Sequence, residues 1–441
     1  MSRPLAVIGA GPVGLAAAAH AVERGLEVVV LEAGPDAGAA VGEWGHVRLF
    51  SAWRELVDPA ARRLLKASGS WSAPDDDAYP TGREWRDAYL RPLARLLAAT
   101  DGVEVRYGSR VTGVGRAGRD LLVDSGRETD PFVLHVATPT GPERLMASAV
   151  VDASGTWGHP NPLGADGYPA VGEPDHADRL HHGIPDLDDP EVAARYAGKH
   201  VAVAGKGASA QGVLVALARL ARQAPTTRVS WLLRRPRLGD AFGGGDNDQL
   251  EQRGRLGLDA AAAAASRVVT HLPRFRTESV TAQPDGRLRI VSVDGQQLDD
   301  VDEVVVATGF RPDHTFLSEV RLDLDPALGC VRALAEQVHP DHHSCGDVSP
   351  HGFRELAQPE PGLYLVGMKS YGRAPSFLAM TGFEQVRSVV AALAGDLDAA
   401  SQVELVLPAT GVCDGAAAFD EPDALAATGG CCGTPEALAT R

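Results

Sequence analysis

Cysteine is scarce in this chain, at five residues in 441, and an odd number of cysteines does not make a disulfide framework. Aromatic residues are also few, at 5%, whereas the hydrophobic content of 44% and the charged content of 23% are ordinary for a globular protein. The length suggests roughly two or three domains with ample buried core. We therefore expect a globular chain whose thiols are reduced.

Positive charge is in deficit, with 42 Lys and Arg against 58 Asp and Glu, and the formal net charge is −16. Such a surface repels phosphate backbones and anionic lipids, which argues against nucleic acid or a membrane as the main partner. No run of about 18 or more apolar residues is present, and the opening MSRPLAVIGAG lacks the pattern of a signal peptide. We expect a cytoplasmic protein that acts on a small molecule.

Glycine, by contrast, is placed where it carries information. An apolar strand over 5–8 is followed by a G-x-G-x-x-G turn, an alanine-rich helix and a second strand that ends at Glu32. In such a turn the first glycine bends the chain, the second lets a pyrophosphate approach the backbone, and the third packs the helix onto the strand. An acid about 20 residues further on accepts hydrogen bonds from a ribose. This context predicts a dinucleotide site, which we assign to FAD, at Gly9, Gly11, Gly14 and Glu32.

The same pattern returns after residue 199, with a strand over 200–204, a G-x-G-x-x-A turn and a helix that carries Ser209 in its first turn. The following strand, 228–233, ends on two arginines rather than on an acid. A carboxylate repels a 2′-phosphate, whereas a guanidinium binds it in bidentate fashion. We therefore predict an NADPH site at Gly205, Gly207, Ser209, Arg234 and Arg235. The alternative is that the two arginines only solvate a strand end.

Two further strands, within 147–160 and 301–313, run into the small-residue turns Ser154-Gly155 and Thr308-Gly309 and bracket the second unit. A last strand ends near Gly367, and a helix from about Thr381 would aim its N-terminal dipole at the flavin. The predicted fold class is doubly wound α/β, with two Rossmann-like domains and the NADPH domain inserted into the FAD domain. The expected divisions are 1–170 and 306–396 for FAD, 195–305 for NADPH, and 397–441 as a flexible tail.

Several long strings carry a family resemblance: EWGHVRLFSAWR, DASGTWGHPNPLGADGYPAVGE, ATGFRPD, HSCGDVSPHG, VGMKSYGRAPSFLAMTGFEQVRSV and VELVLPATGVC. With its G-x-G-x-x-G and G-x-G-x-x-A turns, the chain resembles the flavoproteins with two dinucleotide-binding domains. Within that group, the strings resemble the flavin-dependent oxidoreductases encoded in actinobacterial arsenic-resistance clusters. The F-x-G-x-x-x-H signature of the amine-oxidising flavin monooxygenases is poorly matched before the second turn, which weakens the transfer of their activity.

The resemblance implies FAD, NADPH and a metalloid substrate. On this basis we expect NADPH to reduce the flavin, O2 to react with it, and one oxygen atom to pass to arsenite or methylarsenite. The expected cofactor contacts are Trp44, Arg48, Trp53 and Val111. The expected active-site residues are Lys369, Tyr371, Arg373 and Cys345. Plain packing remains the alternative for these side chains. The oligomeric state stays open, with a homodimer as one option.

The adjacent Cys431 and Cys432, with Cys413, lie in a glycine-rich tail. Thiolates suit soft, thiophilic ions, so these three are predicted to capture As(III) and pass it to Cys345. Incidental cysteines in the tail, and a structural Cys345, are the alternatives. His342 and His343 beside Cys345 lack a second ligand cluster with zinc spacing, and we expect no metal site.

A reductase is the main rival function. No cysteine pair follows the first glycine turn, and residues 195–305 contain no cysteine, which excludes the two internal dithiol arrangements of flavin disulfide reductases. A reductase of a metalloid, thiol or sulfur compound with a mobile C-terminal pair remains open. A flavin-bound arsenic carrier or sensor without turnover is the third option.

Overall fold

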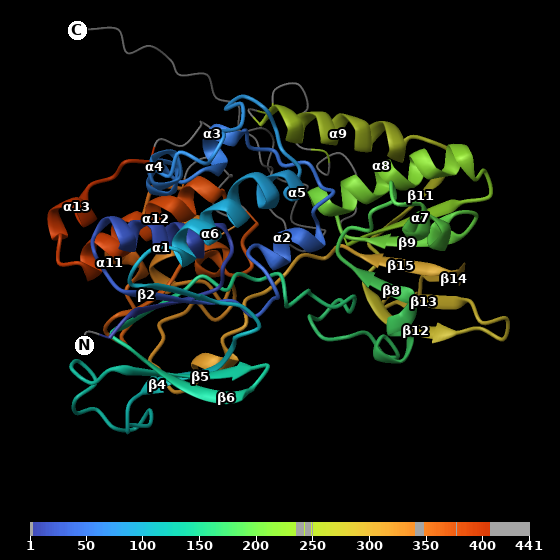
Figure 1. Cartoon of the computed structure of the whole chain (residues 1–441). Helices are drawn as coiled ribbons and strands as arrows, with labels where there is room; N and C mark the ends of the chain where they lie inside the picture. Colours follow the sequence, from blue (N-terminus) through green and yellow to red (C-terminus); the bar gives the residue numbers. More distant parts are fainter. Residues whose placement is uncertain are drawn as a thin grey trace, which may run out of the picture.

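Two parallel sheets, each covered by helices on one face and by a small antiparallel sheet on the other, build this protein (Figure 1). The computed structural model describes residues 3–234, 242, 248, 250–339, 348–375 and 377–405. None of the helices in these ranges is both long and apolar enough to cross a membrane.

The first sheet has five parallel strands in the order β16-β7-β1-β2-β3. Strands β1 and β2 are apolar, β7 is apolar up to its last residue, Asp152, and all three are buried along their whole length, as expected for a sheet that is covered on both faces. The strands are β1 (Leu5–Ile8), β2 (Val28–Leu31), β3 (Val103–Arg106), β7 (Ala149–Asp152) and β16 (Leu363–Leu365).

Helices cover one face of this sheet, and α1 packs directly on α12. Alanine and glycine dominate the buried face of α1, which lets the helix approach the strands closely. These helices are α1 (Pro12–Glu23), α2 (Ala39–Glu43), α3 (Trp53–Leu56), α4 (Pro59–Ala67), α5 (Gly82–Trp85), η1 (Arg86–Leu90), α6 (Arg91–Ala98), α10 (Ala335–Val338), α11 (Phe353–Leu356), α12 (Ala379–Leu393) and α13 (Leu397–Ser401). The opposite face carries the antiparallel β4 (Arg110–Arg116), β5 (Phe132–Thr138) and β6 (Gly141–Ala147).

The second sheet repeats this plan, with five parallel strands in the order β11-β10-β9-β15-β8. Its strands are β8 (Leu180–His182), β9 (His200–Ala204), β10 (Arg228–Leu233), β11 (Val269–Pro273) and β15 (Glu303–Val306). Helices α7 (Pro190–Tyr196), α8 (Ala208–Gln223) and α9 (Glu251–Ala264) accompany it, with the antiparallel β12 (Thr277–Ala282), β13 (Leu288–Ser292) and β14 (Gln297–Val301). Strand β8 belongs to this sheet although it precedes residue 195.

Every strand of the second sheet lies between β7 and β16 in the sequence, so the second unit is inserted into the first. The outgoing and returning crossovers run side by side. Asn161 N donates to Gly309 O at 2.9 Å, and the Thr308 hydroxyl donates to Asn161 O at 2.9 Å. The predicted α/β fold class with two Rossmann-like units is confirmed.

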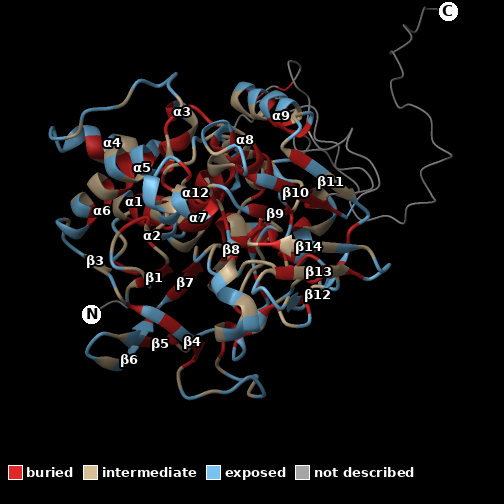
Figure 2. Cartoon of the chain, turned by 90° about the vertical axis from the view of Figure 1, so that its right-hand side faces the viewer, coloured by how far each residue is buried: buried red, intermediate tan, exposed pale blue. Residues whose placement is uncertain are grey.

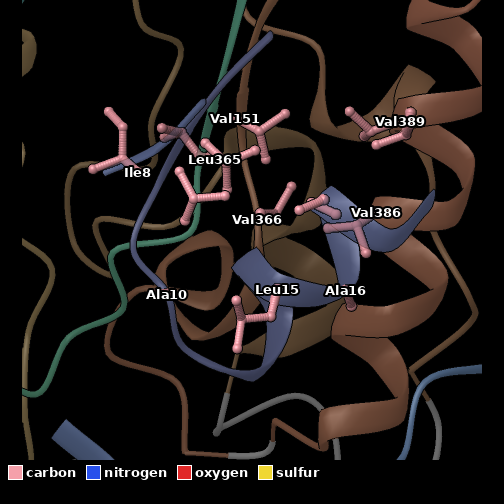
Figure 3. Packing of buried hydrophobic residues seen from close by; sticks show 14 of the residues in the cluster. Ile8, Ala10, Leu15, Ala16, Val151, Leu365, Val366, Val386 and Val389 are labelled. Atoms are coloured by element: carbon pink, nitrogen blue, oxygen red, sulfur yellow. The ribbon is translucent and has the colours of Figure 1, made fainter. Parts of the chain in front are cut away.

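The buried hydrophobic residues of the first unit form one core cluster, and those of the second unit form two. Figure 2 colours the buried residues red. In the first core, Leu15 of α1, Leu365 of β16 and Val386 of α12 pack together (Figure 3). Helix α13, within the expected tail, is attached to this unit because Ser388 Oγ on α12 donates to Ala400 O at 2.7 Å. The described chain then continues to residue 405.

Candidate functional site

The first glycine turn joins β1 to α1 and leaves a cradle at the N-terminus of the helix. Gly9 has φ +103°, and a Cβ there would lie 2.8 Å from Ala153 O. A Cβ on Gly14 would overlap Gly9 O, whereas one on Gly11 would meet nothing within 4 Å. The first and third glycines are therefore required by the fold. The space at the second is open at a helix N-terminus, which fits a pyrophosphate.

The Glu32 carboxylate is held against this turn. Its Oε2 accepts from Ala10 N at 2.7 Å, and its Oε1 accepts from Gly34 N at 2.7 Å. A carboxylate has about four lone-pair sites, so two remain for ribose hydroxyls. The residues of the first turn therefore fit an adenine dinucleotide, and its binding there stays a prediction.

Between β9 and α8, the second turn repeats this geometry. Gly205 has φ +124°, and a Cβ there would overlap Ala307 O, while Gly207 caps α8 and has open space around its Cα. Ser209 is half-buried in the first turn of that helix. Arg234 follows β10 directly and is exposed, and its guanidinium lies 3.4 Å from Gly164 O. Arg235 lies outside the described residues.

The turns after β7 and β15 lie against the two glycine turns. Ser154 Cα would be 3.3 Å from a Cβ on Gly9, and Thr308 N would be 3.5 Å from one on Gly205. Gly155 has φ +68°, and Ser154 N donates to Asp152 Oδ1 at 3.0 Å. Thr308 and Gly309 are both hydrogen-bonded to Asn161 of the outgoing crossover.

A third group of predicted residues converges on the start of α1. Gly367 has φ +68°, and a Cβ there would lie 3.3 Å from Val13. A Cβ on Gly382, next to Thr381 in the first turn of α12, would lie 2.5 Å from the same valine. The N-termini of α1 and α12 therefore meet beside the turn that follows β16, and their positive dipole ends face a common region.

The profile of the pyridine nucleotide-disulphide oxidoreductase family matches residues 3–364. The chain belongs to this family. It is an enzyme of the FAD-dependent oxidoreductase type that uses a pyridine nucleotide, and both glycine turns leave open space at the second glycine.

Solved structures with this fold include reductases and monooxygenases. The bacillithiol disulfide reductase of Bacillus cereus has a TM-score of 0.63 and 19% identity, over 90% of this chain and 99% of that one. The FAD-bound cadaverine monooxygenase of Erwinia amylovora has a TM-score of 0.62 and 14% identity, over 93% and 99%. A flavin monooxygenase from Stenotrophomonas maltophilia has 0.53 and 22%, over 89% and 99%. These likenesses concern the fold.

Among curated proteins, the thiamine thiazole synthase of Methanoculleus marisnigri is 31% identical over 157 residues. The match spans 34% of this chain and 56% of that relative. It therefore covers little more than half the length of the curated protein.

Thiol chemistry, which part of this family uses, finds little support in the described residues. Cys330 is the one cysteine within them, and it is buried. Burial raises the pKa of its thiol to about 11, so it remains protonated at neutral pH. Cys345, Cys413, Cys431 and Cys432 lie outside the described residues. The described residues also contain no group of three or more His, Cys, Asp or Glu side chains that could hold a metal ion.

Tyr371 is buried beside α12, and its phenol shares a hydrogen bond with the Thr381 side chain. Burial raises the pKa of Tyr371 far above its ordinary value, although the bond to Thr381 lowers it. The ring packs edge-on against Phe377 at 5.0 Å. Tyr371 is thus a neutral group that orients the first turn of α12. Arg373 is exposed, and its backbone N donates to Leu328 O at 2.9 Å.

The other predicted contacts come from other elements of the first unit. Trp44 is half-buried and lies against Gly82, 6.5 Å from Trp157. Trp157 in turn stacks on Phe310 of the returning crossover at 4.6 Å. The Arg48 side chain donates to Tyr79 O, and Val111 is buried in β4, opposite Val136 of β5. Cofactor contact by Trp44, Arg48 and Val111 stays a prediction.

A buried polar network around Gly367 was not predicted. Gly367 N donates to Gln385 Oε1 at 2.7 Å, which fixes the amide so that its Nε2 donates to His351 Nε2 at 2.8 Å and to Ser370 Oγ at 2.9 Å. His351 is therefore neutral and donates from Nδ1 to Ser349 O. The sequence gives only a weak signal for this network, namely the polar residue Gln385 within a helix that is buried over most of its length.

Proposed function

We propose that this protein is an NADPH-dependent FAD monooxygenase that oxidises trivalent arsenicals, either arsenite or methylarsenite. Two observations together carry the oxygenase assignment. One glycine turn is followed by an acid and the other by an arginine, which suits FAD at the first and NADPH at the second. In the described residues, no ionisable thiol lies beside either turn. Glu32 serves the first cradle, Arg234 the second, and Cys330 is buried and protonated. The arsenical assignment is supported by the resemblance of the sequence strings quoted above.

Each group of residues has one task in this proposal. Glu32 and the open space at Gly11 hold the resident cofactor, while Gly207 and Arg234 bind the visiting NADPH and favour its 2′-phosphate. Bound FAD supplies the redox chemistry, taking two electrons from NADPH and using O2 to add one oxygen atom to arsenic, with the other oxygen leaving as water. The buried Tyr371, Thr381 and Gln385 hold the turn after β16 and exclude water from it.

The test measures NADPH oxidation and O2 uptake by the FAD-loaded full-length protein, with and without arsenite or methylarsenite. We expect O2 uptake that rises on addition of the arsenical and matches the NADPH consumed. Turnover that needs the arsenical but proceeds without O2 would establish the reductase instead. A complete lack of arsenical-dependent turnover, with FAD bound, would contradict the proposal and favour a carrier or sensor.

A thiol-free variant of the tail sharpens this assay. With Cys431→Ser and Cys432→Ser combined, the monooxygenase proposal predicts that the maximal rate is retained, because these thiols only deliver the substrate. The concentration of arsenical needed for half-maximal turnover should rise. A loss of the maximal rate would indicate that Cys431 and Cys432 themselves transfer electrons, as in a reductase.

A further inference from the structure

Lys369 and Asp152 form an ion pair inside the first unit, and both side chains are fully buried. Lys369 Nζ lies 2.6 Å from Asp152 Oδ2 and donates also to Ser154 Oγ at 3.1 Å. The ammonium group lies 4.4 Å from the centre of the Phe316 ring. Asp152 Oδ1 accepts from Ser154 N, so the pair is satisfied on both sides.

The position of this pair relates it to the cofactor cradle. Asp152 is the last residue of β7, the strand next to β1, and Ala153 behind it contacts Gly9. Lys369 follows Gly367 in the 3-10 turn η7 (Gly367–Tyr371), beside the N-terminus of α12. The carboxyl ends of β1, β7 and β16 thus meet at the pair, and ligands of doubly wound sheets bind at the carboxyl ends of the strands.

Stability alone does not account for a fully buried ion pair. Removing two charges from water costs about as much as their attraction returns, and an apolar pair of similar volume serves a core as well or better. A charge in a region of low dielectric does, however, act strongly on a neighbouring group that changes its own charge. A flavin is such a group, because its reduction adds negative charge and protein charges near the ring tune it.

We propose that Lys369 and Asp152 set the reduction potential of the bound FAD, with Lys369 stabilising the reduced cofactor and Asp152 holding the ammonium in place. Both are positioning residues, since neither has to touch a substrate. Asp313 and His314, on the returning crossover, are titratable groups that also interact electrostatically with Lys369. The proposal does not depend on which substrate the enzyme oxidises.

Opposite substitutions test this proposal through the midpoint potential of the FAD-loaded protein, measured without arsenical. Lys369→Met leaves the negative partner and should lower the potential, whereas Asp152→Asn leaves the positive partner and should raise it. We expect each change to alter the ratio of reduced to oxidised FAD at a fixed poise about tenfold, which is ~30 mV for a two-electron couple. The double variant should return close to the native value, and Lys369→Arg should stay near it.

Glu303→Gln is the matched control, because it removes a carboxylate that pairs with Arg195 in the second sheet. Its FAD potential should be unchanged. If the two single variants fold and bind FAD but shift the potential in the same direction, or not at all, the proposal is wrong and the pair is structural. If one single variant fails to fold, the other decides: a shift of the potential in its predicted direction supports the proposal, and an unchanged or opposite potential contradicts it.

Discussion

Arg234 is the residue that distinguishes the second dinucleotide turn from the first. The first turn is followed by a strand that ends on Glu32, whose carboxylate is held by two backbone N–H groups. Arg234 holds the corresponding place after β10 and is exposed, and among the described residues its guanidinium contacts Gly164 O at 3.4 Å. A guanidinium binds a 2′-phosphate in bidentate fashion, and this is the physical basis of the proposed NADPH preference.

Replacing Arg234 with Ala, alone and together with Arg235→Ala, should therefore weaken NADPH binding and leave NADH binding almost unchanged. A charge-assisted hydrogen bond is worth roughly 1.5–3 kcal/mol, so we expect a loss of about tenfold or more for NADPH. Dissociation constants for the two nucleotides, measured by titration of the FAD-loaded protein, check this. Arg222→Ala, on the exposed end of α8, is the control. Equal losses for NADPH and NADH would contradict the 2′-phosphate role.

At the scale of elements, the glycines of each strand-turn-helix unit have different structural roles. Gly205 has a positive φ and a backbone oxygen of Ala307 where its Cβ would be. Gly207, two residues later, has an ordinary φ of −71° and open space around it. The first glycine is therefore required for the backbone to fold, whereas the second leaves open space in which we expect the pyrophosphate to lie.

Two alanine substitutions separate these tasks. Gly207→Ala should leave the melting temperature unchanged but weaken NADPH binding strongly, because the methyl group occupies the space of the pyrophosphate. Gly205→Ala should destabilise the second unit by about 1–3 kcal/mol, the usual cost of a strained backbone conformation. FAD content should stay native in both, since the first turn is untouched. Melting curves and NADPH titration measure these effects, and a native NADPH affinity of Gly207→Ala would exclude the predicted cradle.

For the whole molecule, five histidines whose rings are at least partly desolvated link stability to pH. Burial lowers the pKa of each in the folded protein: His181, His182, His200, His314 and His351. His351 illustrates the cause, because its Nε2 accepts a hydrogen bond from Gln385 and a proton there would remove that acceptor. The folded state therefore keeps these rings neutral.

The sign of the effect follows from proton uptake. The unfolded chain takes up protons on these rings as pH falls through about 6.5, the ordinary histidine value, while the folded chain resists until lower pH. Stability is fully present above about pH 6.5 and should fall as the pH drops below it. Melting temperatures between about pH 8 and about pH 5 measure this. His351→Gln should make the decline shallower, whereas the exposed His135→Gln should not; an identical slope in all three proteins would refute the assignment.

Local patterns were sufficient for much of this fold. The strands at 5–8, 200–204 and 228–233, the turns with positive φ at Gly9 and Gly205, and the helix after Gly367 all follow from short-range spacing of apolar residues and glycine. The insertion of the second unit could also be predicted, because the order of the two turns along the chain is visible. Backbone sterics and helix capping operate between close neighbours, so one sequence is enough to predict them.

The buried ion pairs between residues far apart in the sequence were decided only by the tertiary structure. Lys369 meets Asp152 across 217 positions of the chain, and Arg116 meets Glu360 across 244. The sheet of β4, β5 and β6 was not predicted either, since β6 mixes Pro142, Glu143 and Arg144 without clear alternation. By itself the sequence predicted the two glycine turns and their place between strand and helix. Which polar groups become partners depended on folding, because distant residues become neighbours only when the strands assemble and water is excluded between them.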